Sequence, residues 1–185
     1  MSERPLPSDS PLTERLASLI RAVPDFPQPG ITFRDITPLL AEAAAFATAT
    51  REMAKPFAGA VTAVVGIEAR GFILAAPIAQ LLGVGLIPVR KQGKLPWDTH
   101  AHTYALEYGT DTLEVHRDAL VEKDVVLVVD DVLATGGTAS AACELVSRGF
   151  GARVAGVSVL LEIVGLGGRA RVEATGIPVE TVLVV

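Results

Sequence analysis

Hydrophobic runs rich in valine and leucine alternate along the chain with segments of helical spacing. The runs at 61–67, 84–90, 124–131, 153–163 and 179–185 each fit a single strand. They are apolar at successive positions, so both faces of the sheet that they form must be covered. We therefore predict an α/β fold with a mostly parallel central sheet flanked by helices.

Helices are predicted where apolar residues recur every three or four positions. Helices at about 71–82 and 137–148 each follow a strand, and two more, at about 12–22 and 38–55, precede the first strand. The segment 24–30 holds three prolines in seven residues, which excludes regular structure there. We interpret this segment as a loop with a fixed course.

The organisation of the chain follows from its length and from where this alternation stops. The polar stretch 91–102 interrupts the pattern and is expected to be a mobile loop that includes two histidines, and 103–107 and 112–117 then predict a hairpin. Residues 1–10, with three charges and two prolines, are expected to be a flexible tail. Residues 11–185 have the length of one domain.

Composition and charge exclude several classes of protein. Half of the residues are hydrophobic, 20% are charged and the formal net charge is −5, which argues against a disordered chain and against nucleic acid or an anionic membrane as partner. Cys143 is the only cysteine and the three histidines are scattered, so no disulfide framework or Cys/His metal site is expected. A cytoplasmic location fits best.

The most apolar window, 71–89, is long enough to be considered as a membrane span. It contains Pro77, Gly83, Gly85 and Pro88, which divide it into a helix, a turn and a strand. We therefore predict that it belongs to the buried core of the α/β fold and that the protein has no membrane partner.

The strongest candidate site follows the most apolar strand. Asp130 and Asp131 end this strand, and a T-G-G-T sequence, Thr135 to Thr138, opens the next helix. Glycines let backbone N–H groups converge, and a helix N-terminus favours an anion, so this loop fits a phosphate. Carboxylates repel phosphate, so the aspartates should face sugar hydroxyls, a magnesium ion, or both. The plain alternative is a glycine turn capped by threonine.

Other nucleotide motifs do not fit the glycines of this chain. A P-loop has a glycine, four further residues and then Gly-Lys-Ser/Thr; Gly66 and Gly71 have this spacing, but Phe72 and Ile73 follow Gly71. A dinucleotide-binding turn does not fit either, because Pro88 stands where its last glycine is needed.

In parallel sheets ligands lie at the carboxyl ends of strands, so the loops after 67, 90 and 129 are the places to expect a site.

The segment 125–138 resembles the motif with which type I phosphoribosyltransferases bind 5-phosphoribosyl 1-pyrophosphate (PRPP). Four further blocks, at 24–40, 66–72, 90–96 and 104–109, are similar to the adenine phosphoribosyltransferases in order and spacing. The resemblance implies the type I fold with a small N-terminal hood, and the conversion of adenine and magnesium-bound PRPP to AMP and pyrophosphate. Magnesium (Mg2+) is the implied cofactor, carried by PRPP near Asp130 and Asp131, with no direct metal ligand assigned.

The resemblance also implies a role for individual residues. The loop that binds the 5-phosphate comprises Ala134, Thr135, Gly136, Gly137 and Thr138, while Asp130 and Asp131 hold the ribose hydroxyls. Adenine is expected beside three residues of a hood formed by about 11–40, namely Thr32, Phe33 and Arg34.

Pyrophosphate is expected to meet a group of cations. The segment from Gly66 to Lys94 holds four basic residues and one acid, a local charge of +3; the four cations are Arg70, Arg90, Lys91 and Lys94. The resemblance assigns catalysis to Arg70, Lys94 and Glu107, with Tyr108 completing the site, and marks the Glu68–Ala69 peptide bond as strained.

Two alternatives remain open from the sequence. A phosphoribosyltransferase for another base, such as xanthine, would share the phosphate and pyrophosphate loops. A PRPP-sensing regulator without catalysis would need a DNA-reading module, for which the 23 residues before the 24–40 block are too few and not basic. A homodimer is expected from the resemblance alone.

Overall fold

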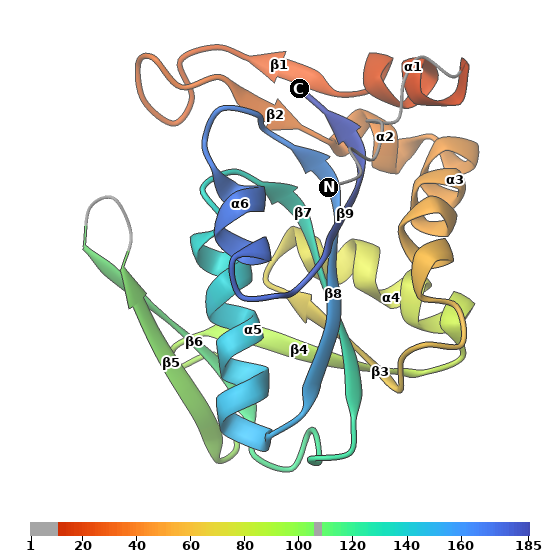
Figure 1. Ribbon diagram of the computed structural model, residues 1–185. Coiled ribbons are helices and arrows are strands. Elements are labelled where there is room, and N and C mark those ends of the chain that lie inside the picture. The colour runs from red at the N-terminus through yellow and green to blue at the C-terminus, as the bar shows by residue number, and fades with distance from the viewer. Residues whose placement is uncertain (1–10, 106–108) are drawn as a thin grey trace.

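The computed structural model describes residues 11–105 and 109–185 (Figure 1). The predicted tail 1–10 and the predicted site residues Glu107 and Tyr108 lie outside them. A seven-stranded sheet forms the centre of the molecule. In spatial order its strands are β5 (Thr99–Ala105), β6 (Thr110–His116), β4 (Gly85–Lys91), β3 (Ala63–Ile67), β7 (Val125–Leu133), β8 (Arg153–Glu162) and β9 (Val179–Val184).

Parallel pairing joins five of these strands, from β4 through β3, β7 and β8 to β9. The hairpin of β5 and β6 adds to β4 in the antiparallel direction. The predicted α/β fold with a mostly parallel sheet is confirmed.

Two layers of helices cover the sheet, as the continuous apolar strands require. Val65, Val126 and Val128 face α5 (Gly137–Phe150), while the neighbouring Val64 and Leu127 face the other core, which includes α3 (Ala43–Ala54) and α4 (Arg70–Leu82). Successive side chains of a strand point to opposite faces, so each buried strand contributes to both cores.

The order of the strands reverses between β3 and β7, the position at which parallel sheets generally have a crevice. The chain leaves β3 through α4 for β4 on one side, whereas β7 pairs with the other side of β3 and the chain then continues outward to β8 and β9. At such a reversal the loops at the carboxyl ends of the two strands diverge, which leaves room for a ligand.

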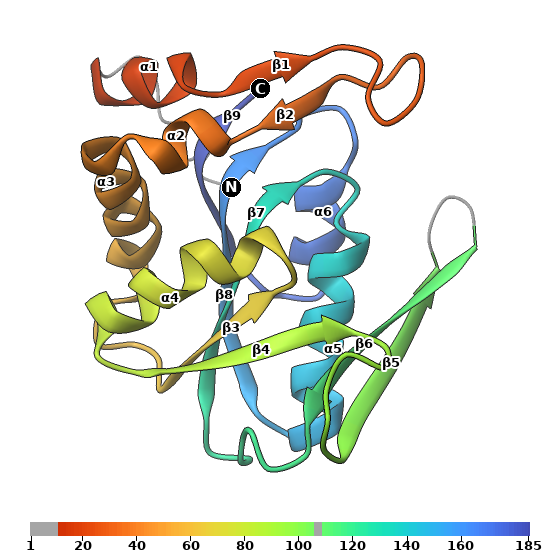
Figure 2. The same cartoon turned by 180° about the vertical axis from the view of Figure 1, so that it is seen from behind.

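The N-terminal segment lies across the carboxyl end of the sheet, above the ends of β7 and β8 in both views (Figures 1 and 2). It comprises α1 (Pro11–Ser18), β1 (Arg21–Val23), β2 (Phe33–Asp35) and α2 (Thr37–Ala41).

Two of the helices predicted in this region differ from the structure. The helix predicted at 12–22 ends at Ser18, because residues 21–23 pair with β2 as a short antiparallel strand. The helix predicted at 38–55 is divided at Glu42, which has extended backbone angles and accepts hydrogen bonds from the N–H groups of Ala44 and Ala45, so that a new helix begins.

The prediction that His100 and His102 lie in a mobile loop is wrong. Both belong to β5, which begins at Thr99 opposite His116. The His100 ring packs edge-on against Phe150 at 4.9 Å, and the His102 Nε2 atom lies 3.6 Å from a Glu144 carboxylate oxygen. A polar sequence can form this strand because its inner face meets the helix α5 through imidazole rings rather than aliphatic side chains.

Two short helices were not predicted: the 3-10 helix η1 (Lys55–Phe57) and α6 (Gly168–Glu173). The apolar window 71–89 forms α4 and most of β4, as predicted. Across the described residues, no helix combines the length and the apolar character that a membrane crossing requires.

Candidate active site

An ion pair joins the carboxyl ends of β3 and β7. Arg70 is the first residue of α4, directly after the loop that follows β3, and its Nε atom lies 2.8 Å from Oδ2 of Asp131 near the end of β7. Asp130 accepts a hydrogen bond on Oδ1 from the N–H of Asp131 at 2.9 Å. The structure thus brings together three predicted site residues from two segments far apart in the sequence.

The electrostatics of the acidic pair suit a ligand that donates hydrogen bonds or carries positive charge. Burial raises the pKa of Asp130 well above its usual value, and the charge of Asp131 raises it further. Burial also raises the pKa of Asp131, although Arg70 opposes this shift. Oδ2 of Asp131 is buried and accepts no well-aligned hydrogen bond from the residues described.

Close packing of α4 on β7 sets the position of the acidic pair. A Cβ atom added at Gly71 would lie 3.0 Å from Oδ1 of Asp130 and 3.0 Å from the carbonyl oxygen of Val129. Only glycine therefore lets the first turn of α4 approach the strand this closely, and Arg70 reaches Asp131 because of that approach.

The predicted phosphate loop connects β7 to α5. Gly136 has a left-handed φ of +74°, and no side chain caps the N-terminus of α5. The first N–H groups of this 14-residue helix therefore remain available to an anion, assisted by the helix dipole. Thr135 is exposed, and the Thr138 hydroxyl lies 3.3 Å from the Tyr104 hydroxyl.

Three of the four predicted pyrophosphate cations are already paired with carboxylates, Arg70 with Asp131 as described above. Arg90 lies 3.0 Å from Glu68 and donates a second hydrogen bond to the Lys94 carbonyl, while Lys91 lies 3.1 Å from Asp111. The hydrogen bond with Asp111 raises the pKa of Lys91. Lys94 is exposed and has no ion pair with any residue that the structure describes.

Two further observations concern the segment around Arg90 and Arg70. Arg90 and Lys91 belong to β4 itself, so the loop that connects β4 to β5 begins only after them. Because Arg90 forms an ion pair with Glu68, Arg90 is connected to the loop that immediately precedes Arg70. The Glu68–Ala69 peptide bond, singled out from the sequence, is cis.

The predicted base-binding segment contacts Arg70 through Phe33. Phe33 lies in β2, and the Arg70 guanidinium carbon is 4.8 Å from the centre of its ring. Phe26 packs edge-on against the Phe33 ring, with the ring centres 5.3 Å apart. Thr32 is exposed and Arg34 half-buried, on either side of Phe33. The hood, the cation and the acidic pair therefore form one continuous chain of contacts.

Comparison with known proteins identifies the family to which this chain belongs. The model of the phosphoribosyl transferase domain matches residues 34–173. An adenine phosphoribosyltransferase of Streptomyces clavuligerus is 57% identical over 171 residues, which cover 92% of this chain and 96% of that protein. The chain belongs to the adenine phosphoribosyltransferase family.

Solved structures of adenine phosphoribosyltransferases share the fold over almost the whole chain. The enzyme from Rhodothermus marinus is 51% identical with a TM-score of 0.89, covering 94% of this chain and 98% of its own. The enzyme from Saccharomyces cerevisiae, complexed with adenine and an imino-altritol bisphosphate, is 34% identical with a TM-score of 0.86, covering 93% and 98%.

Sequence reasoning missed several residues that the structure places around this candidate site. Gly71 follows Arg70 in the block 66–72, but its role depends on the distance between α4 and β7, which the sequence does not show. Glu68 and Asp111 hold the cations, but only Glu68 offered a signal, as the one acid among them. The glycine-rich segment 165–168 is not part of the predicted site, although Gly168 lies close to the backbone of Ala134 and Gly136.

Proposed function

We propose that this protein transfers the 5-phosphoribosyl group of PRPP to adenine, giving AMP and pyrophosphate in purine salvage. The observation that carries the proposal is the acidic pair Asp130–Asp131 next to the uncapped N-terminus of α5, with Arg70 across the crevice. The identity to adenine phosphoribosyltransferases over nine-tenths of the chain favours adenine over another base.

The proposed binding of PRPP divides its groups among the parts of the site. The loop 134–138 would hold the 5-phosphate through backbone N–H groups, and Asp130 and Asp131 would accept hydrogen bonds from the ribose hydroxyls. Adenine would lie in the hood formed by about 11–40, against Phe33. Ribose hydroxyls that occupy Asp131 would release Arg70, which then becomes available to pyrophosphate.

The proposed reaction forms one bond at the anomeric carbon and breaks another. N9 of adenine attacks this carbon with inversion, and the bond to the pyrophosphate oxygen breaks with its electron pair, through a state with oxocarbenium character. Arg70 and Lys94 would neutralise the leaving group, and we assign Glu107 to proton transfer at the purine ring. The loop after β4 would exclude water, which could otherwise hydrolyse PRPP.

Magnesium fits the donor set only together with the substrate. The described residues contain no group of three or more metal-ligating side chains, whereas Asp130 and Asp131 provide two adjacent carboxylates, of which Asp131 is paired with Arg70. PRPP and water would therefore supply most of the ligands. When bound with PRPP, magnesium would offset the charge of the pyrophosphate group.

We also propose a homodimer located in the cytoplasm. Three large side chains remain exposed on α4 and at the start of β4, namely Ile73, Leu81 and Leu86. A second copy could cover them. The only cysteine, Cys143, is unpaired and buried in α5, which suits a reducing compartment.

The deciding experiment measures pyrophosphate release from magnesium-bound PRPP, separately with adenine, hypoxanthine, guanine, xanthine and orotate. Release with adenine alone is the expected result. Release with another base instead would overturn the base assignment and keep the PRPP site. If PRPP binds but no base leads to pyrophosphate release, the protein is a PRPP-sensing regulator and the assignment as an enzyme is wrong.

A further inference from the structure

The backbone of the phosphate loop rests on the backbone of a second loop. A Cβ atom added at Gly168 would clash with the Ala134 carbonyl oxygen and lie 3.0 Å from the Gly136 nitrogen. Conversely, a Cβ atom at Gly136 would lie 2.6 Å from the Gly168 carbonyl oxygen. Two glycines thus meet without any side chain between them, and a displacement of one must displace the other.

Gly168 begins the short helix α6, which lies beside the N-terminal end of α5 in both views (Figures 1 and 2). A helix of six residues has little stability of its own, so side-chain contacts must fix its position. The residue immediately after Gly168 makes such contacts.

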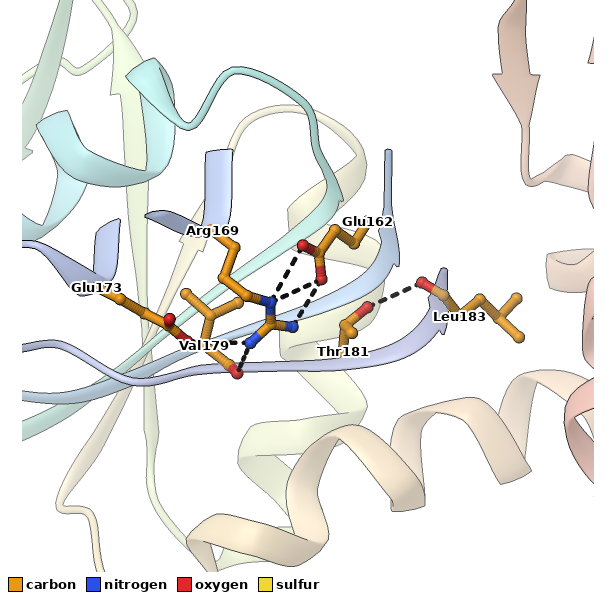
Figure 3. A network of polar contacts seen from close by, with 6 residues as sticks. All are labelled: Glu162, Arg169, Glu173, Val179, Thr181 and Leu183. Carbon is orange, nitrogen blue, oxygen red and sulfur yellow. Dashed lines mark hydrogen bonds and ion pairs between the residues drawn. The ribbon is translucent and has the colours of Figure 1, made fainter. Parts of the chain in front are cut away.

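Arg169 ties α6 to the ends of two strands (Figure 3). Its Nε and Nη2 atoms donate to the Glu162 carboxylate, with a shortest distance of 2.6 Å, and Nη1 donates to the Val179 carbonyl at 2.7 Å and to Glu173 at 3.1 Å. Glu162 is the last residue of β8 and Val179 the first of β9. A guanidinium used at all three nitrogens in this way is held in one orientation.

Burial makes this contact difficult to replace. Glu162 is 8% exposed, and Arg169 is the one cation paired with it among the described residues. Removal of the guanidinium would leave a buried carboxylate without its counter-charge. Glu162 also lies opposite Leu133, the last residue of β7, so Arg169 is anchored directly beside the origin of the phosphate loop.

We propose that Arg169 is a positioning residue for the phosphate of PRPP: it holds Gly168 against Ala134 and Gly136 and so fixes the N–H groups of the loop. The proposal rests on the function proposed above for this loop. Arg169 itself does not touch the ligand. Anion binding by converging N–H groups depends on their mutual geometry, so a loosened support weakens it without any change in the loop's own sequence.

The test compares two ligands that use different parts of the site. Dissociation constants of ribose 5-phosphate and of pyrophosphate are measured by calorimetry for the full chain and for Arg169→Ala. We expect ribose 5-phosphate to bind about tenfold more weakly and pyrophosphate to bind within about twofold of the unchanged protein. The matched control is Arg148→Ala, which removes an arginine paired with Glu144 on the exposed side of α5 and is expected to alter neither constant.

Two more variants keep the proposal testable if Arg169→Ala does not fold. Gly168→Ala forces the two backbones apart and is expected to weaken ribose 5-phosphate selectively, while Arg169→Lys, which keeps one contact with Glu162, should restore part of the affinity. Equal weakening of both ligands, or of neither, overturns the positioning role. Absence of ribose 5-phosphate binding by the unchanged protein would instead overturn the proposed function of the loop.

Discussion

Asp130 and Asp131 are carboxylates kept in surroundings that disfavour their charge. Burial raises the pKa of each, and the charge of Asp131 raises the pKa of Asp130 further, whereas Arg70 opposes the rise at Asp131. The ionised pair therefore lowers the stability of the folded protein near neutral pH. A ligand that supplies hydroxyl donors or a cation would restore the lost stability. Such a cost at a binding site is a common exchange of stability for function.

Replacement of one carboxylate should therefore stabilise the protein while it weakens the binding of PRPP. We expect Asp130→Asn to raise the melting temperature at pH 7 by about 2–4 °C, or about 1 kcal/mol. Because the pKa of Asp130 is raised in the folded state, the wild-type protein loses stability as pH rises from the ordinary aspartate value of 3.8 through this raised pKa. The stability that Asp130→Asn gains over the wild type should therefore shrink as pH falls toward 3.8. Thermal scans across this pH range measure it, with the exposed Asp118→Asn as control; a lower melting temperature at pH 7 would contradict the argument.

Glu107, which lies outside the described residues, carries the second prediction at this scale. If it transfers a proton at the purine ring, Glu107→Gln should lower kcat by about 10²- to 10³-fold and leave PRPP affinity within about twofold. Initial rates at saturating substrates, together with PRPP binding by calorimetry, separate these quantities. An unchanged kcat would remove the proposed role.

Among the elements, α4 shows how a helix places a reactive group. Its first turn lies against β7 through Gly71, and its first residue, Arg70, spans the crevice to Asp131 and to Phe33 of the hood. The helix thus connects three parts of the site through two consecutive residues.

A methyl group at this contact should disturb the site more than the fold. In Gly71→Ala the new Cβ meets Oδ1 of Asp130 and the Val129 carbonyl at 3.0 Å, so either the carboxylate or the helix must move. We expect PRPP affinity to fall about tenfold, measured by calorimetry. The matched control is Gly85→Ala, where a Cβ meets nothing within 4 Å. Equal behaviour of both variants would contradict the prediction.

The loop between β4 and β5 contains the only tryptophan, Trp97, whose side chain is 69% exposed. If this loop closes over PRPP, the indole should leave water and its fluorescence emission should move to shorter wavelength on addition of magnesium-bound PRPP. Adenine alone, as the control, should leave the spectrum unchanged. An emission maximum that does not respond to saturating PRPP would show that the loop remains open.

The sequence predicted those elements whose signal is local. Continuous apolar runs identified every strand of the parallel part, and the T-G-G-T sequence located the start of α5. The β1–β2 pair, the strand character of 99–102 and the helix α6 depend instead on partners distant in the chain, which outweigh the local pattern. For the same reason the sequence indicated Arg70 and Asp131 separately, but their contact and the pairing of Lys91 with Asp111 required the folded geometry.

The whole molecule has unequal surfaces. The carboxyl end of the sheet, with the candidate site, lies beneath the N-terminal segment (Figure 2). By contrast, Ile73 and Leu81 of α4 and Leu86 at the start of β4 are exposed to solvent. In the proposed dimer, these apolar side chains would let two copies with a net charge of −5 each associate through uncharged groups.

The dimer proposal gives a direct expectation. Leu81→Glu should shift the protein from dimer to monomer at micromolar concentration, because two buried glutamates would face an apolar partner. Sedimentation velocity measures the species present. The control, Val121→Glu, changes an equally exposed apolar side chain in the segment before β7 and should leave the dimer intact. A wild-type protein that sediments as a monomer would contradict the proposal at once.

The pairing of Arg90 with Glu68 and of Lys91 with Asp111 has a consequence for selectivity. If Arg90 and Lys91 bind the pyrophosphate group, that group must displace Glu68 and Asp111, so binding at these two cations would be an exchange of anions rather than a capture by free charge. Isolated phosphate and other polyanions would gain little from such an exchange, whereas a ligand anchored elsewhere by its ribose and base could complete it. The same carboxylates return when the bond to ribose breaks, and they would thereby speed the departure of pyrophosphate.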